Sequence, residues 1–197
     1  LDFASGVRSM MRQDPDIIMV GEIRDQETAE MAFRAAMTGH QVFSTLHANS
    51  AVLSIPRLVD MGVTPDLITG NLIGIVAQRL VRKLCPKCKS AYTPSEPERL
   101  LLGMKEADQA PLYRPVGCAA CNGAGYKGRM ALTELLRFDE MLDDMVAQGV
   151  RSAEILAYAR KEGFSTMAED GVHRVIEGAT ALEEVARVVD LTRIGRT

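Results

Sequence analysis

The sequence predicts an α/β protein: part of a parallel sheet with flanking helices, a small tetracysteine subdomain and a helical C-terminal region. Three observations carry this prediction. A strand–helix–strand pattern fills the first 50 residues, two cysteine pairs lie in the middle of the chain, and helical periodicity marks its end. With 197 residues, 47% of them hydrophobic, the chain can bury one moderate core and a small appendage.

The strand–helix–strand pattern begins at Asp16–Val20, an apolar run without alternation that is typical of a strand buried on both faces of a parallel sheet. Asp25 is a good N-cap for a helix over Glu27–Met37, which is rich in alanine and ends near Gly39. Gln41–Leu46 then predicts a second strand. A right-handed crossover would make the two strands parallel.

Polar residues follow both predicted strands. Glu22 comes just after the first strand and His47 just after the second. Because the carboxyl ends of parallel strands meet at one edge of the sheet, where α/β proteins bind ligands, we expect Glu22 and His47 to share a crevice. Nucleotide hydrolases place a carboxylate in this position to order magnesium or the attacking water. Taken singly, Glu22 could be a solvated turn residue and His47 a capping or core histidine.

The four cysteines form two C-x-x-C pairs, Cys85/Cys88 and Cys118/Cys121. This spacing is typical of four thiolates that close tetrahedrally around one zinc ion. Two disulfides or inert core thiols are one alternative, but nothing else in the sequence resembles a secreted protein. A redox motif is the other, but neither pair lies at a strand–helix junction of a βαβ pattern. Four thiolates and one zinc ion carry a net charge of −2, and basic residues nearby in the sequence could offset it: Arg79, Arg82, Lys83, Lys87, Lys89, Lys127 and Arg129.

Composition narrows the function classes. The net charge is −3 and the isoelectric point is about 5.7, which disfavours a nucleic-acid reader. No apolar run approaches the ~20 residues that a membrane-spanning helix needs, and the first residues do not resemble a targeting signal. A cytoplasmic protein is therefore the expectation.

The remaining pattern predicts mostly helices. Pro65–Leu84 carries apolar residues at helical spacing, interrupted by Gly70 and Gly74, and a short helix is expected over Glu98–Met104. Further helices are predicted over Asp139–Gln148, Ser152–Glu162, Thr166–Glu177 and Ala181–Val188.

Several segments resemble a known family. Arg12–Asp25 resembles the Walker B segment of bacterial secretion ATPases, and Thr38–His40 with Ser44–Asn49 resembles their histidine box. Ala77–Cys85 and the second cysteine pair with its glycine-rich continuation are similar to the tetracysteine members that drive type II secretion and type IV pilus assembly. The resemblance covers essentially the whole chain.

The resemblance implies a partial RecA-like sheet and roles for four residues of the expected crevice. Glu22 would be the Walker B acid acting on magnesium-bound ATP or its attacking water, and His47 would read the γ-phosphate. Thr45 and Arg24 would be cofactor-binding residues, with Arg24 also fixing the strand-to-helix turn. His40 and His173 receive no catalytic role.

The resemblance also implies an organisation and partners. Residues 1–84 would belong to the ATPase domain, 85–130 to a structural zinc subdomain, and 131–197 to a helical subdomain. The parent protein would be a homo-hexamer that works with inner-membrane platform proteins at the cytoplasmic face of that membrane, without nucleic acid.

One departure from the family pattern is large. The phosphate-binding G-x-x-x-x-G-K-[ST] loop is missing, because the sequence contains no Gly-Lys dipeptide. We therefore expect the chain to be the C-terminal part of a longer ATPase and to bind and hydrolyse ATP poorly by itself. The alternative is a stand-alone zinc-binding interaction module, since Cys118–Gly125 also resembles the C-x-x-C-x-G-x-G repeat of J-domain co-chaperones, although only one copy is present.

Overall fold

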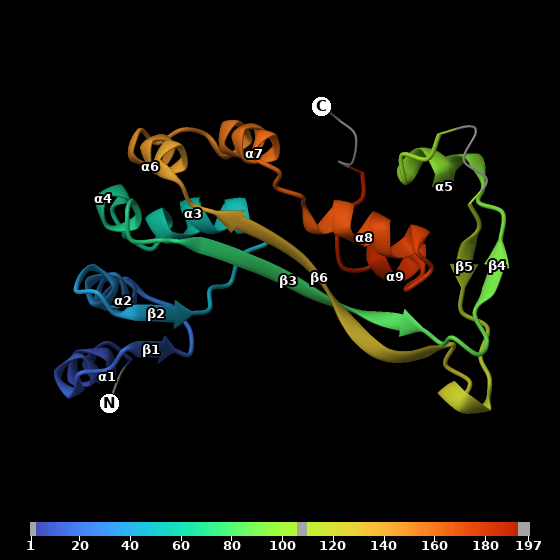
Figure 1. Ribbon diagram of the computed structural model, residues 1–197, viewed down its shortest axis with the longest axis horizontal. Helices are drawn as coiled ribbons and strands as arrows, with labels where there is room; N and C mark the ends of the chain where they lie inside the picture. The colour runs from blue at the N-terminus through green and yellow to red at the C-terminus, as the bar shows by residue number, and fades with distance from the viewer. Residues whose placement is uncertain (1–2, 106–109, 193–197) are drawn as a thin grey trace. The chain divides into compact units, whose positions relative to one another are not determined.

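The computed structural model describes residues 3–105 and 110–192 (Figure 1). The chain divides into two compact units. Unit 1 contains the residues up to Ala77 and Leu135–Phe164, and unit 2 contains Gln78–Glu134 and the residues from Ser165 onward. The three-part division expected from motifs, at residues 84 and 130, stays a prediction.

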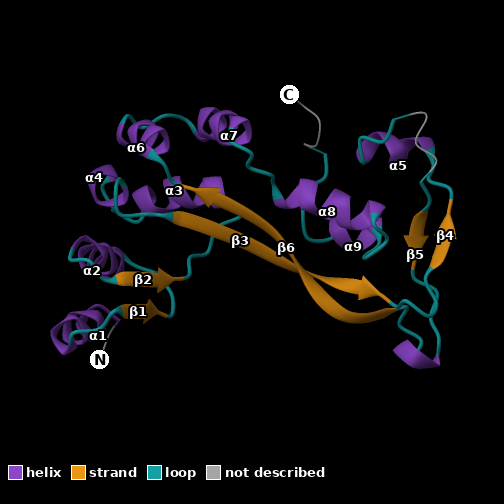
Figure 2. Ribbon diagram, in the orientation of Figure 1, coloured by secondary structure: helices purple, strands orange, loops and turns teal. Residues whose placement is uncertain are grey.

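Both units contain helices and strands (Figure 2). The α-helices are α1 (Phe3–Met10), α2 (Gln26–Met37), α3 (Ala51–Asp60), α4 (Pro65–Ile68), α5 (Glu96–Leu101), α6 (Glu140–Ala147), α7 (Ser152–Lys161), α8 (Met167–Ile176) and α9 (Leu182–Ala186). The 3-10 helices are η1 (Met11–Gln13) and η2 (Ala119–Cys121). The strands are β1 (Ile17–Val20), β2 (Gln41–Ser44), β3 (Gly74–Leu84), β4 (Ser90–Tyr92), β5 (Leu112–Arg114) and β6 (Tyr126–Arg137). They pair as β1–β2, β3–β6 and β4–β5.

The predicted strand–helix–strand unit is present. β1 and β2 are parallel, and Ile17 pairs with Gln41 at one end while Val20 pairs with Ser44 at the other. The side chain of Asp25 caps α2 by accepting a hydrogen bond from the Thr28 N–H at 2.8 Å. Because β1 and β2 are parallel, their carboxyl ends lie at the same edge of the sheet.

The burial of β1 differs from the prediction. Ile18 and Val20 are buried against α1 and α2, but Ile17 is 63% and Met19 71% exposed. The apolar run lacks alternation, yet the described helices cover only one face of β1, and the opposite face keeps its hydrophobic side chains in solvent. The sequence had instead predicted a strand that is buried on both faces.

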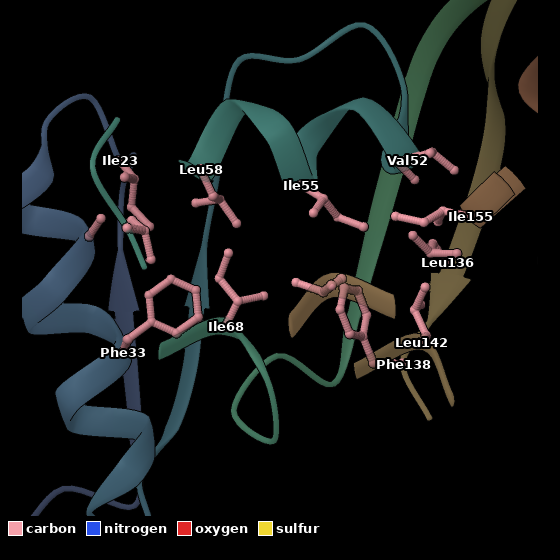
Figure 3. Packing of buried hydrophobic residues seen from close by; sticks show 14 of the residues in the cluster. Ile23, Phe33, Val52, Ile55, Leu58, Ile68, Leu136, Phe138, Leu142 and Ile155 are labelled. Atoms are coloured by element: carbon pink, nitrogen blue, oxygen red, sulfur yellow. The ribbon is translucent and has the colours of Figure 1, made fainter. Parts of the chain in front are cut away.

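The main core of unit 1 joins α2, α3, α4, α6 and α7 (Figure 3). Phe33 of α2, Ile55 of α3 and Ile68 of α4 lie in this cluster with Leu142 of α6 and Ile155 of α7. These side chains are almost completely buried. The core holds the helix that follows Glu22 and the helix that follows His47 in one packed body.

The segment from Pro65 to Leu84 is not a continuous helix, so this expectation was wrong. Only α4 is helical, and β3 occupies Gly74–Leu84. The inward-facing side chains of β3 include Ile75, Ala77 and Val81. Val76 and Leu80 point outward and are more than half exposed. Apolar residues on both faces of a strand produced a spacing that also fits a helix.

Unit 2 has its own core, to which β3, β5, β6, α8 and α9 contribute. Val81, Leu112, Leu132, Val175 and Val185 are its most completely buried members. β4 and β5 form an antiparallel pair next to the cysteines in the sequence. Strand β6 was not anticipated, and the expected boundary at residue 130 falls inside it.

The four C-terminal helices α6 to α9 confirm the predicted ones to within a few residues. The short helix between the cysteine pairs, α5, begins two residues before the expected Glu98. Among the described residues, no helix combines the length and apolar character that crossing a membrane requires.

Candidate active site and metal centre

Glu22 lies in a loop held by both strands. The Ile23 N–H donates to the Thr45 carbonyl at 2.9 Å, and the Thr45 hydroxyl donates to the Gly21 carbonyl at 2.7 Å. The residue after Arg24 is Asp25, the N-cap of α2. The loop that presents Glu22 is thus fixed on one side by β2 and on the other by the start of a helix.

The structure brings Glu22, Arg24 and His47 together. Oε1 of Glu22 is 2.6 Å from Nη2 of Arg24, and Oε2 is 3.5 Å from Nε2 of His47. The Glu22 side chain is 23% exposed, whereas that of His47 is 88% exposed. The Glu22 carboxylate is therefore partly buried at the strand edge, whereas the His47 imidazole is exposed to solvent.

Arg24 controls the ionisation of Glu22. The guanidinium lowers the pKa of Glu22 below its usual value, first through its hydrogen bond and also through its charge, and His47 adds to this effect. Partial burial of the carboxyl group opposes the shift. The same pair raises the pKa of Arg24. Glu22 is a carboxylate at neutral pH, and such a group accepts hydrogen bonds or binds a cation rather than donating a proton.

Thr45 and the other histidines have defined contacts. The Thr45 hydroxyl is used in the bond to Gly21, which ties β2 to the Glu22 loop. Nδ1 of His40 is 3.0 Å from the Ala35 carbonyl, as expected of a positioning residue, and His173 pairs with Glu177 at 3.0 Å. The cofactor-binding roles of Arg24 and Thr45 stay predictions.

The four cysteines form a second site. Their sulfurs all lie within 4.8 Å of one another. The pairs Cys85–Cys118, Cys88–Cys121 and Cys118–Cys121 are separated by 3.9, 3.8 and 3.8 Å. Four sulfurs at the corners of a tetrahedron around zinc would be ~3.8 Å apart, given Zn–S bonds of ~2.3 Å. The cluster could therefore bind a metal ion.

Backbone N–H groups point at the sulfurs. Cys121 Sγ accepts from the N–H of Cys118 and of Gly125, both at 3.2 Å, and Cys88 Sγ accepts from the Gly117 N–H at 3.3 Å. Gly125 has φ +73°, and a Cβ there would lie 2.5 Å from Cβ of Pro115. The turn that aims its N–H at sulfur therefore requires glycine.

Two thiols have opposite tendencies to ionise. Burial raises the pKa of Cys88 to about 11, despite the Gly117 hydrogen bond. Burial also opposes ionisation of Cys121, but the donors from Cys118 and Gly125 outweigh it and lower the pKa of Cys121 to about 6. Of these two thiols, Cys121 therefore ionises more readily.

Some of the nearby basic residues have other partners. Arg82 forms a 2.6 Å ion pair with Glu184, and Lys89 donates to the Gly178 carbonyl at 2.7 Å. These two side chains are engaged with the C-terminal helices and not only with the charge of the cysteine cluster. Lys83, Lys87, Lys127 and Arg129 are exposed.

Glu184 was not recognised from the sequence. Its side chain is 1% exposed and accepts from Arg82 and from Arg187, whose Nη2 is 2.7 Å away. Although burial acts against ionisation, these donors lower the pKa of Glu184 to about 2. The sequence shows only two neighbouring glutamates, Glu183 and Glu184, between the apolar Leu182 and Val185, and this pattern does not single out the buried one.

Comparison with known proteins identifies the family. The family model described as Type II/IV secretion system protein matches residues 1–187. The chain is 48% identical over 188 residues to type II secretion system protein E of Pseudomonas aeruginosa, with 95% of this chain and 37% of that protein covered. It is also 48% identical over 194 residues to the type IV pilus assembly ATPase TfpB of Acinetobacter baylyi, with 98% and 33% covered.

Solved structures agree with this result. The pilus retraction motor PilT with bound ADP matches at a TM-score of 0.67 and 26% identity, over 96% of this chain and 44% of that one. The ATPase DotB of Legionella pneumophila matches at 0.63 and 26%, over 95% and 42%. The chain spans about a third of the length of the two curated relatives, type II secretion system protein E and TfpB. It belongs to the type II/IV secretion system protein family, whose named members include secretion and pilus ATPases.

Proposed function

We propose that this chain supplies the Walker B acid and the histidine box of an ATPase that powers type II secretion or type IV pilus assembly. The observation that carries the proposal is the placement of Glu22 and His47, 3.5 Å apart at the carboxyl ends of two parallel strands. The named activities of the relatives support it. The co-chaperone alternative has no support from these matches, which extend over residues 1–187.

Glu22 would act as a hydrogen-bond acceptor. Its ionised carboxylate can orient the attacking water or hold a water of the Mg²⁺ shell, because Arg24 keeps its pKa low. Bound Mg²⁺ would offset charge on the ATP phosphates during hydrolysis. The loop bonds from Ile23 and Thr45 would fix Glu22, so that little reorganisation is needed when ATP binds.

His47 would contact the γ-phosphate. Its imidazole is 88% exposed and touches Glu22 through Nε2. A group in this position can respond to phosphate on one side and to the carboxylate on the other. We propose that loss of the γ-phosphate changes the contact between His47 and Glu22, and that this change passes to α3, which begins four residues after His47.

The cysteine cluster would hold structural zinc. Four cysteine sulfurs within 4.8 Å of one another, three of their separations at 3.8–3.9 Å, and N–H donors to sulfur all fit this ion. Zinc would cross-link the two C-x-x-C turns and would take no part in ATP hydrolysis.

We further propose that the chain is the C-terminal part of a longer protein, that this protein is a homo-hexamer, and that it binds inner-membrane platform proteins at the cytoplasmic face. The coverage of about a third of each relative supports a longer protein, and the C-terminal placement is supported by the resemblance described above. The hexamer and the membrane partners are supported by resemblance to the family alone. By itself the chain should bind ATP weakly and hydrolyse it negligibly, so measured turnover at the level of a complete motor would contradict the proposal.

The test uses the chain joined to the part of its natural protein that supplies the phosphate-binding loop. Glu22→Gln should lower kcat by about 10²-fold or more while ATP still binds, because an amide lacks the carboxylate charge. Glu27→Gln, an exposed acid on α2, is the matched control. Equal kcat values for Glu22→Gln and Glu27→Gln would refute the assignment.

A further inference from the structure

The turn between α8 and α9 is bonded to both sides of the first cysteine pair. Before Cys85, the Leu84 N–H donates to the Ala179 carbonyl at 2.9 Å, and the Arg82 carbonyl accepts from the Thr180 hydroxyl at 2.8 Å. After Cys88, Lys89 Nζ donates to the Gly178 carbonyl at 2.7 Å. Residues 178–180 of this turn are therefore each held by the segment that carries the first two cysteines.

Lys89 belongs to the cysteine turn through its backbone. Its N–H donates to the Cys85 carbonyl at 3.0 Å, as the Cys88 N–H does at 3.2 Å. Its side chain crosses the ring of Tyr113, with Nζ 4.3 Å from the ring centroid, and ends on Gly178. One residue thus connects the backbone around the first C-x-x-C pair to the end of α8.

The α8–α9 turn fits closely against this arm. Gly178 has φ +67°, and a Cβ there would overlap the ring of Tyr113. Thr180 is completely buried, and Gly178 is buried as well. Buried polar groups that lose their partners are costly, so loss of the contacts from Lys89 and Leu84 would destabilise this conformation of the turn.

Glu184 extends the same connection into α9. The Arg82 N–H donates to Oε1 of Glu184 at 3.0 Å, and its guanidinium binds Oε2. The guanidinium also lies over the Tyr126 ring, 4.1 Å from its centroid. Tyr126 begins β6 directly after Gly125, whose carbonyl accepts from the Cys85 N–H at 2.9 Å. Residues next to both cysteine turns are therefore connected to α9 through the Arg82 side chain.

We propose that metal binding at the four cysteines sets the position of the α8–α9 turn, with Lys89 as the positioning residue. The proposal rests on the metal site proposed above and goes beyond it. There, the metal orders its own two turns, whereas here it also controls Val175–Val185, a segment that contains no cysteine. When the metal is lost, the first cysteine turn relaxes and Lys89 and Leu84 lose their hydrogen bonds to residues 178 and 179. The α8–α9 turn then opens.

A local account of the turn makes the opposite prediction. Gly178 and Ala179 also donate to Val175 and Arg174, which are ordinary bonds at a helix C-terminus. Val175 and Val185 lie in the core of unit 2. If these contacts suffice, the turn should keep its structure after the metal and the Lys89 side chain are removed.

Hydrogen exchange by mass spectrometry separates the two accounts. Exchange of peptides over residues 171–188 and 85–129 would be measured in the protein as purified and after metal removal by chelation, with metal content determined first. Lys89→Met removes the ammonium and keeps an apolar chain of similar length. Lys87→Met, at an exposed lysine between Cys85 and Cys88, is the matched control. Peptides from α6 and α7 of unit 1 report any general loss of folding.

We expect chelation to speed exchange over 171–188 by about tenfold or more, together with opening of 85–129. Lys89→Met should raise exchange over 171–188 by about tenfold with full metal content and protected cysteine turns, and Lys87→Met should not. Unchanged exchange over 171–188 after chelation, or equal exchange in Lys89→Met and Lys87→Met, would overturn the coupling while leaving the metal site intact. A purified protein without metal would overturn both, and the metal analysis identifies that case.

Discussion

Oε2 of Glu22 lies 3.5 Å from Nε2 of His47, and the two residues follow neighbouring parallel strands. α2 and its loops separate the two residues in the sequence, and the crossover returns the chain so that both strands end at one edge. The other oxygen of Glu22 binds Arg24. This arrangement gives one carboxylate two different basic neighbours, and each can be removed separately.

Removal of Arg24 should change the pH dependence of ATP hydrolysis. Arg24 is the largest cause of the lowered pKa of Glu22, so Arg24→Gln should let this pKa rise toward its ordinary 4.5. A carboxylate with a lowered pKa stays ionised as the pH falls, until the pH reaches that pKa. The acidic limb of the pH profile of kcat should therefore move to higher pH in Arg24→Gln. An acidic limb at the same pH in wild type and variant would contradict the role given to Arg24.

The metal site predicts about one zinc per chain. Cys118→Ser removes one of four thiolates and should lower the zinc content well below one equivalent, because a hydroxyl is a poor ligand for this ion. Residues 85–129 should then lose protection in hydrogen exchange, since metal binding and local folding are coupled. Ala119→Ser, a change at the next position, should keep both. Wild-type protein with well under half an equivalent of zinc would count against the site.

Glu184 should make stability depend on pH in the acidic range. Its pKa falls from 4.5 to about 2 on folding, which corresponds to about 3 kcal/mol of stabilisation at neutral pH. Because the folded-state pKa is lowered, this contribution is complete above pH 4.5 and is lost as the pH falls toward 2.

Glu184→Gln should therefore reduce the free energy of unfolding by about 3 kcal/mol at pH 7, and the difference from wild type should shrink below pH 4.5. Denaturant titrations between pH 3 and pH 7 measure this. Glu183→Gln, at the exposed neighbouring position, should have little effect. A constant difference between Glu184→Gln and wild type across this range would show that the Glu184 charge is unimportant.

Gly125 and Gly128 permit a matched pair of substitutions near the metal site. Both have positive φ, +73° and +78°, so alanine at either position should cost about 1–2 kcal/mol of backbone strain. Only Gly125→Ala also forces a methyl group against Pro115, because the space at Gly128 is open.

Gly125→Ala should therefore destabilise the protein more than Gly128→Ala and should weaken zinc binding, since the Gly125 N–H donates to Cys121 Sγ. Competition with a chelator of known affinity measures the second effect. Equal zinc affinities in the two variants would argue that this N–H does not matter for the metal.

Local signals predicted the elements that position Glu22 and the second cysteine pair. Asp25 marks the start of α2 through a capping bond, and the glycines after Cys121 allow turns that few other residues can adopt. Such signals act over a few residues. The pairing of Glu22 with His47 required only one further rule, the handedness of the crossover.

Long-range features could not be predicted in this way. β3 was assigned to a helix because its exposed Val76 and Leu80 obscure the two-residue alternation. Ile17 and Met19 are apolar but exposed, so composition misjudged the burial of β1. Glu184 is buried with Arg82, 102 residues earlier in the chain, as one of its partners, and a contact of that range leaves no local signal.

The most direct test of the central claim is a double-mutant cycle on ATP hydrolysis with Glu22→Gln and His47→Asn, in the chain joined to its natural phosphate-binding loop. If both side chains act on one nucleotide as a unit, each single change should lower kcat about 10²-fold, and the double change should add little to either. Losses that multiply in the double variant, or single variants with wild-type kcat, would contradict a shared nucleotide site.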